Sequence, residues 1–163
     1  MTLNRSAGKP GTGGGLGAIL DLSASSLTAN ADILLPSGKL SLRATNGDLR
    51  IGGRVSVEGT TRVFNDLTRH ANAGTITLQS TTGDVVIEKS AVVSVSASSA
   101  GGNAGTLSVQ ATQGVFANTG SLTGIAANGF ASGRFTLDAA TLPGGASSFA
   151  SINSSLDSGN FNE

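Results

Sequence analysis

Apolar and polar residues alternate in short runs along most of this chain. The stretch 74–97 holds three such runs, Thr75–Gln79, Asp84–Glu88 and Val92–Ser96, with turn residues between them. Alternation over about four to eight residues is typical of a β-strand with one buried face. The pattern therefore predicts three short strands within this stretch.

The same pattern recurs in units that open on a glycine. These glycines are residues 38, 74, 105 and 133, which gives spacings of 36, 31 and 28 residues. Since side chains two apart in a strand share a face, the aligned units predict which residues face inward. In the first strand, one inward column is Leu40, Ile76, Leu107 and Phe135, the next is Leu42, Leu78, Val109 and Leu137, and the outward column between them is Ser41, Thr77, Ser108 and Thr136.

The second and third strands of the unit repeat as well. Residues 45–51 align with residues 81–87, and Val55 aligns with Val93. An earlier unit that opened at Gly17 would place Asp21 in an apolar column. For that unit, either the register is shifted or the assignment is wrong.

A repeat of this length with three strands and no helix is typical of a β-solenoid. The turns between strands are too short for antiparallel hairpins to place the three strands of every unit in the same repeated direction. Corresponding strands of successive units are therefore expected to pair in parallel. We therefore predict an all-β fold, a parallel β-helix over residues 16–142, with about four to five coils of three short strands each. Small aliphatic side chains would fill its narrow bore, consistent with the absence of Trp and Tyr.

Both ends of the chain differ in composition from the repeats. Residues 1–15 are predicted to be a flexible Gly-rich segment, because they end in the run GKPGTGGG. Residues 143–163 are a Gly/Ser/Asn-rich tail whose weak apolar alternation leaves open a further partial coil. Because solenoids need polar caps and the sequence shows none, both ends are expected to be cuts through a longer array.

Charge and hydropathy exclude several classes of protein. Ten basic and ten acidic residues give a net charge of +0, which argues against a nucleic-acid partner because phosphate binding needs a concentrated basic face. No apolar run approaches the roughly 18 residues that span a membrane. The start of the chain has no apolar core of a signal peptide. Without cysteine, neither a disulfide scaffold nor a thiolate metal site is expected.

No motif in the sequence predicts a cofactor, a metal ion or a catalytic residue. Gly13-x-Gly15-x-x-Ala18 matches a dinucleotide fingerprint only formally, since that motif needs a strand before it and a helix after it. The chain has a single histidine, His70, without the partners of a catalytic triad or a metal site. The sequence therefore predicts no enzyme activity.

Asp48 and Asp84 occupy the same position in adjacent units. Paired carboxylates about one strand spacing apart could bind calcium or act in acid–base catalysis. The next unit has Val115 at that position, and no third acid follows. The preferred interpretation is that each aspartate stabilises its own turn. The outward Ser/Thr column likewise has two interpretations, a sugar-binding strip or an ordinary solvent face, of which we favour the second.

The longest insertion, Thr60–Asn72, is the candidate partner-binding loop. Loops on rigid scaffolds often carry recognition, and this one concentrates charged and titratable side chains. The alternative is a solvated insertion whose apolar residues Val63, Phe64 and Leu67 pack against the side of the stack. The candidate binding residues are Arg62, Asp66, Arg69 and His70.

The segments 72–78 (NAGTITL) and 101–109 (GGNAGTLSV) resemble the repeat regions of the filamentous haemagglutinin family, large bacterial exoproteins secreted by the two-partner pathway. The resemblance covers residues 17–142. It implies a right-handed β-helix, secretion to the bacterial cell surface through an outer-membrane two-partner secretion transporter, and adhesion to host-cell or surface glycans or proteins. The amino-terminal secretion domain of that family, with its Asn-Pro-Asn-Gly-type motifs, is not visible here.

These observations lead to one expected function and two alternatives. The chain is expected to be a structural and adhesive segment, the rigid shaft of a secreted filamentous adhesin. The first alternative is a carbohydrate-active β-helix enzyme of the polysaccharide lyase or hydrolase type. The second is the rod of a toxin-delivery protein, which would share the shaft and differ only in a distal domain.

Overall fold

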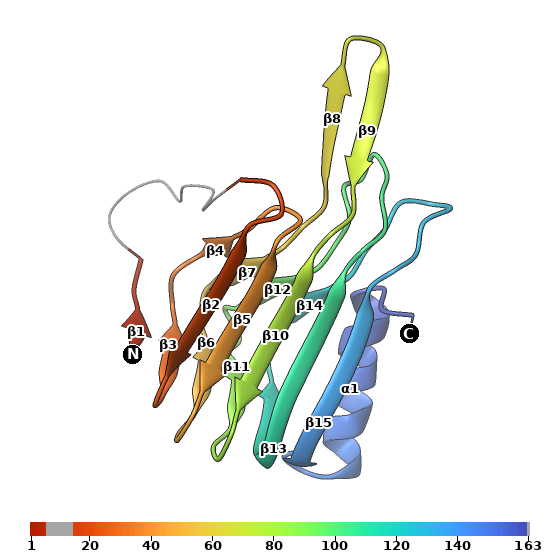
Figure 1. Cartoon of the computed structure of the whole chain (residues 1–163). Helices are drawn as coiled ribbons and strands as arrows, with labels where there is room; N and C mark the ends of the chain where they lie inside the picture. The colour runs from red at the N-terminus through yellow and green to blue at the C-terminus, as the bar shows by residue number, and fades with distance from the viewer. Residues whose placement is uncertain (6–14, 163) are drawn as a thin grey trace.

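Parallel pairing between strands of successive repeat units organises the fold (Figure 1). The computed structural model describes residues 1–5 and 15–162. Strands make up 49% of it and helix 8%. The prediction of a β-rich fold built from parallel strands is confirmed, with one helix that the sequence interpretation missed.

Three parallel ladders run through the molecule, and together we call them the stack. The first ladder has the order β2 (Ile19–Ala24), β5 (Lys39–Ala44), β10 (Thr75–Ser80), β13 (Thr106–Asn118) and β15 (Arg134–Thr141). The second has the order β1 (Thr2–Leu3), β3 (Leu27–Ala29), β6 (Leu49–Ile51), β11 (Val85–Ile87) and the end of β13. The third has the order β4 (Ile33–Leu34), β7 (Arg54–Ser56), β12 (Val92–Ser94) and β14 (Ser121–Thr123). Because β13 runs through two ladders, they join into one curled sheet.

The predicted inward columns are confirmed by the strand register. Ile76 pairs with Leu40 on one side and with Leu107 on the other. These three side chains are buried and belong to one continuous apolar core. Residues of the outward column, which includes Thr77, also pair with one another from unit to unit. Burial of the apolar face of each unit on the next therefore forms the core.

The first unit has a shifted register, which settles the alternative that the sequence left open. Leu20 pairs with Leu40 and Asp21 pairs with Ser41, so Asp21 faces outward and is exposed. Ala18, rather than Gly17, takes the position of the opening glycine, and its carbonyl accepts a hydrogen bond from the Lys39 N–H at 2.9 Å. The alignment on Gly17 was wrong by one residue.

Residues 146–158 form helix α1 (Ala146–Ser158), so the interpretation of the tail as a further partial coil is wrong. The apolar residues Phe149, Ile152 and Leu156 are spaced by three and four, which is the helical period rather than the strand period. Ile152 is buried and Leu156 packs against the core, whereas Phe149 stays exposed. The helix lies against β14 and covers one end of the stack (Figure 1).

Aromatic side chains fill the core beneath helix α1. The rings of Phe116 and Phe135 have centroids 6.3 Å apart, and those of Phe135 and Phe161 are 6.2 Å apart. Phe161, which follows the helix, is buried and forms a β-bridge with Gly133. The segment after β15 therefore closes this end of the core with a helix and a phenylalanine instead of another set of strands.

The amino-terminal segment contains one strand that the sequence interpretation missed. Strand β1 pairs in parallel with β3, with Leu3 opposite Ala29. Residues 6–14 of the predicted flexible segment lie outside the described residues, and with them Gly13 of the formal dinucleotide motif.

The insertion after β7 is an antiparallel hairpin rather than a loop. It consists of β8 (Thr60–Phe64) and β9 (Leu67–Ala71) and extends beyond the ends of the neighbouring strands (Figure 1). Asn65, with φ 53°, starts the two-residue turn, a conformation that asparagine tolerates better than most residues. The expectation that Val63, Phe64 and Leu67 pack against the stack is wrong, since they are 67%, 63% and 48% exposed.

Two columns of glycine let the repeat units approach closely at the turns that flank the first ladder. A Cβ at Gly74 would lie 1.7 Å from the carbonyl oxygen of Gly38, and one at Gly105 would lie 1.9 Å from that of Gly74. The second column behaves in the same way, since a Cβ at Gly114 would lie 2.0 Å from the carbonyl oxygen of Gly83. No side chain can occupy such a position without separating two units.

Gly74→Ala is expected to lower the free energy of unfolding by about 1–3 kcal/mol or more, because the added methyl overlaps the backbone of the preceding unit. Chemical denaturation followed by circular dichroism measures the change. Gly15→Ala is the matched control, since no atom lies within 4 Å of a Cβ at that position. Equal stability of the two variants would contradict the close packing of the glycine column.

Candidate functional site

The hairpin formed by β8 and β9 separates the predicted binding residues onto different faces. Arg62 lies directly opposite Arg69, and Phe64 lies opposite Leu67. Because alternate residues of a strand share a face, these two pairs lie on one face of the hairpin, which we call the arginine face. Asp66 lies at the turn. The structure thus brings Arg62 and Arg69 together, with two exposed apolar side chains beside them.

His70 lies on the opposite face of the hairpin, where its contacts anchor the hairpin base. Its Nδ1 is 2.9 Å from Oγ1 of Thr61, whose hydroxyl donates a hydrogen bond to Ser98 at 2.7 Å. The imidazole meets the ring of Phe130 edge to face, with centroids 6.1 Å apart, and a Cβ at Gly101 would lie 2.9 Å from its Nε2. These contacts attach the hairpin to two neighbouring loops, so His70 has a positioning role.

Asp48 and Asp84 connect successive repeat units instead of forming a paired-carboxylate site. Oδ1 of Asp48 accepts a hydrogen bond from the backbone N–H of Asp84 at 3.1 Å, and Oδ1 of Asp84 accepts one from Val115 N–H at 2.8 Å. Each aspartate therefore satisfies a backbone donor of the next unit. The preferred interpretation, a structural role at the turn, agrees with this geometry and adds a bond between units. The recurrence of Asp at one position was the signal in the sequence.

The pKa of Asp48 lies below its ordinary value of 3.8, mainly because the Asp84 N–H donates a hydrogen bond to the carboxylate. The guanidinium of Arg50, 2.9 Å away, lowers the pKa further, while partial burial opposes both effects. The pKa of Asp32 is also lowered, first by a backbone hydrogen bond from Arg54 and then by Arg5. Both carboxylates are thus stabilised in the charged form by structural partners.

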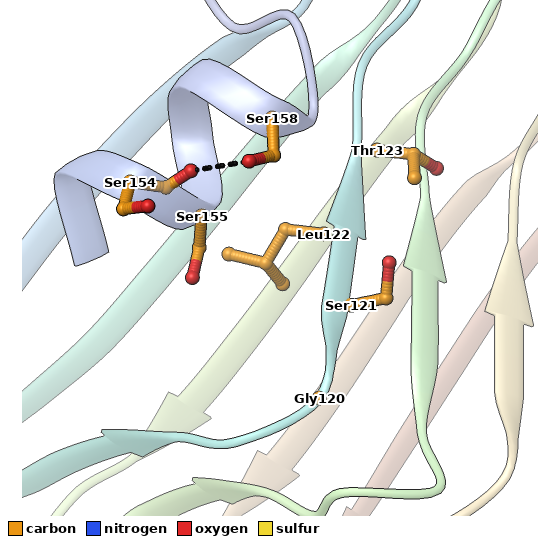
Figure 2. Close-up of a pocket in the computed structure, with 7 residues that line it drawn as sticks. All are labelled: Gly120, Ser121, Leu122, Thr123, Ser154, Ser155 and Ser158. Carbon is orange, nitrogen blue, oxygen red and sulfur yellow. Dashed lines mark hydrogen bonds between the residues drawn. The ribbon is translucent and has the colours of Figure 1, made fainter. Parts of the chain in front are cut away.

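A groove of about 240 Å³ lies between helix α1 and β14, as Figure 2 shows. Serine and threonine hydroxyls dominate its lining, but the helix uses several of them internally. The hydroxyl of Ser158 donates to the carbonyl of Ser154 at 2.8 Å, and that of Ser155 donates to the carbonyl of Ser151 at 2.9 Å. The lining carries no charged side chain, and two of its hydroxyls are already bonded within the helix, so this groove has little capacity for specific binding.

Two larger hollows adjoin at Glu58, on the side of the stack from which the hairpin extends. One has a volume of about 450 Å³ and includes Asp32 and Arg54, and the other has about 390 Å³ and includes Ser96 and Ile125. Arg54 forms an ion pair with Glu58 at 2.7 Å. The charged groups of these hollows are therefore largely neutralised by one another. Within residues 1–5 and 15–162, no three His, Asp or Glu side chains gather as a metal site would require.

The outward Ser/Thr column is a continuous line across the first ladder. Thr77 lies between Ser41 and Ser108 in register, and Thr136 continues the line. The column itself is confirmed, and the favoured interpretation of it as an ordinary solvent face, rather than a sugar-binding strip, stays a prediction.

Comparison with family models, curated proteins and solved structures found no match to this chain. The resemblance to the filamentous haemagglutinin repeats therefore rests on the two glycine-rich segments alone. Among the described residues, no helix is long and apolar enough to cross a membrane.

Sequence reasoning missed the pairing of Arg62 with Arg69 because it treated the insertion as a loop. The signal was present, since the turn-forming residues Asn65 and Asp66 directly follow a run rich in β-branched and aromatic residues, Thr60–Phe64. Reading it as a hairpin would have placed both arginines on one face.

Asp48→Asn is expected to make the unfolding free energy less dependent on pH in the acid range. The pKa of Asp48 is lower in the folded chain, so its contribution is present above the unfolded pKa and is lost as pH falls through the lowered value. Urea unfolding at a series of pH values below about pH 5 measures this slope. The matched control is Asp21→Asn, which removes an exposed carboxylate from β2. Parallel acid profiles for the parent chain and Asp48→Asn would contradict the assignment.

Proposed function

We propose that the chain is a non-enzymatic structural and adhesive segment, a right-handed parallel β-helix that holds the β8–β9 hairpin away from a rigid body. The observation that carries the proposal is the hairpin itself, which extends beyond the stack with its apolar residues exposed (Figure 1). An exposed two-stranded hairpin is marginal in stability by itself. Its presence on an otherwise closely packed body supports a role in contact with a partner.

Features of the stack support the scaffold part of the proposal. Apolar columns pair in register through all the repeat units, and the glycine columns allow close approach of the backbones. The units that open at residues 38, 74 and 105 therefore rest on their neighbours over three ladders, which resists bending and local opening. The hairpin base is fixed to this body through His70 and Thr61. Such a body would present the hairpin in a fixed direction.

We further propose that this segment belongs to a secreted bacterial adhesin of the filamentous haemagglutinin type, displayed at the cell surface after two-partner secretion. The segments 72–78 and 101–109, which lead into β10 and β13, support this placement. The partner would be a glycan or protein on a host cell or another surface. A rod of a toxin-delivery protein would share the same segment.

The geometry at Asp48 and Asp84 favours the structural proposal over a carbohydrate-active enzyme. General acid–base catalysis needs a carboxylate free to exchange a proton with the substrate. Here each carboxylate accepts a backbone hydrogen bond from the following unit. Both residues are thus occupied in holding the repeat units together.

Replacement of residues 60–71 by a short Gly-Ser linker is expected to abolish adhesion while leaving the stack folded. The linker can close because Gly59 lies beside Ala71 and Ala73. Beads coated with the parent chain or the variant would be incubated with cell surfaces and the bound beads counted. A variant with Arg43→Ser and Gln79→Ser, on the outward side of the first ladder, is the matched control and should retain adhesion. Undiminished adhesion without the hairpin would refute the display role.

A further inference from the structure

The arginine face of the hairpin combines two positive charges with two exposed apolar side chains. Arg62 and Arg69 are directly opposite, as are Phe64 and Leu67 one pair nearer the turn. Like charges at directly opposed positions destabilise an antiparallel pair. The face thus carries an unfavourable arrangement that an acidic group close to the guanidinium groups would relieve.

Three other arginines of the chain have acidic partners, whereas Arg43 and Arg134 have none among the described residues. Arg5 pairs with Asp32, Arg50 with Asp48 at 2.9 Å, and Arg54 with Glu58 at 2.7 Å. Within the described residues, no carboxylate lies within ion-pair distance of the two hairpin arginines. Charge complementarity therefore calls for an acidic partner at this face.

The outer edge of β8 is open for backbone pairing. In the part of the chain that the structure describes, β8 pairs with β9 alone. The side of β9 adjoins the loop 98–103, where Asn103 N–H donates to Asn72 Oδ1 at 2.9 Å and Gly102 approaches Ala71. Edge strands present unpaired N–H and C=O groups that a further strand can use.

We propose that the β8 edge and the arginine face bind an extended segment of a partner protein as an added strand. In the bound segment, an acidic side chain would lie beside Arg62 and an apolar side chain two residues away would lie beside Phe64, because side chains two apart share a face. Backbone hydrogen bonds would provide affinity, and the two side-chain contacts would select the segment. This inference rests on the proposed display role and names the partner class.

Two other occupants fit the observations less well. A membrane surface would have to accept the side chains of Asn65 and Asp66, which occupy the turn, and burial of such polar groups in lipid is unfavourable. A glycan site commonly uses the broad rings of Trp or Tyr, and the chain contains neither. A peptide strand uses both the open backbone edge and the charge pattern.

The test is fluorescence anisotropy of the full chain with a labelled peptide in which Glu and Val lie two residues apart with Thr between them. The parent chain is expected to bind this peptide and not the version with Lys in place of Glu. Arg62→Glu/Arg69→Glu is expected to weaken binding of the Glu peptide at least tenfold, equivalent to about 1.4 kcal/mol. The same variant should gain binding of the Lys peptide, which shows that it has folded. Alternate N-methylation of the Glu peptide should abolish binding, because it blocks the backbone hydrogen bonds.

Failure of the Glu peptide to bind, or equal binding to the parent chain and the charge-reversed variant, would overturn the proposal. Arginine-dependent binding to phosphatidylserine vesicles or to a polyuronate, in place of the peptide, would also overturn it in favour of a lipid or a glycan. The adhesion assay with the hairpin replaced separates this inference from the proposed function. If adhesion requires the hairpin and the peptide does not bind, the display role stands and only the partner class is wrong.

Discussion

Close stacking of identical backbone positions is the constraint on which the rest of the structure depends. Parallel strands of successive units lie about 4.8 Å apart, and at the turns the backbones approach so closely that only glycine fits, as at Gly74 and Gly105. With the turns fixed, the same apolar position of every unit falls in one column, and the core follows from Leu40, Ile76 and Leu107. Hydrogen bonds that the Asp48 and Asp84 carboxylates accept from the next unit reinforce the register at the second turn.

The same constraint determines where the chain can vary. Additional residues inside a ladder would break the register, whereas residues between β7 and β10 leave it intact. The hairpin uses that freedom, and its anchoring through Thr61 and His70 turns an insertion into a feature with a fixed direction. The folding stability of the stack is thus independent of the side chains on the proposed recognition surface, since the exposed arginine face contributes no packing to the core.

The sequence predicted the ladders well because each column repeats the same chemistry, and several agreeing copies make the inference robust. It failed where a feature occurs once. Helix α1 has one buried residue, Ile152, and its short apolar pattern was weak evidence for either period. The hairpin has no second copy to reveal its pairing, and the opposition of Arg62 and Arg69 depends on a two-residue turn. The first unit was displaced by one residue because Ala18 replaces the opening glycine.

Disulfide cross-linking tests the stacked register most directly, since the chain has no cysteine of its own. Ser41 and Thr77 are paired on the outward face of adjacent strands, and Ser108 is one strand further on. Cysteines at 41 and 77 would have Cα atoms about 4.8 Å apart, within the range of a disulfide. The account predicts rapid oxidation of the Ser41→Cys/Thr77→Cys variant and none for Ser41→Cys/Ser108→Cys, in which an intervening strand separates the thiols. Equal oxidation of the two variants, or cross-linking of only the second, would contradict the parallel stack.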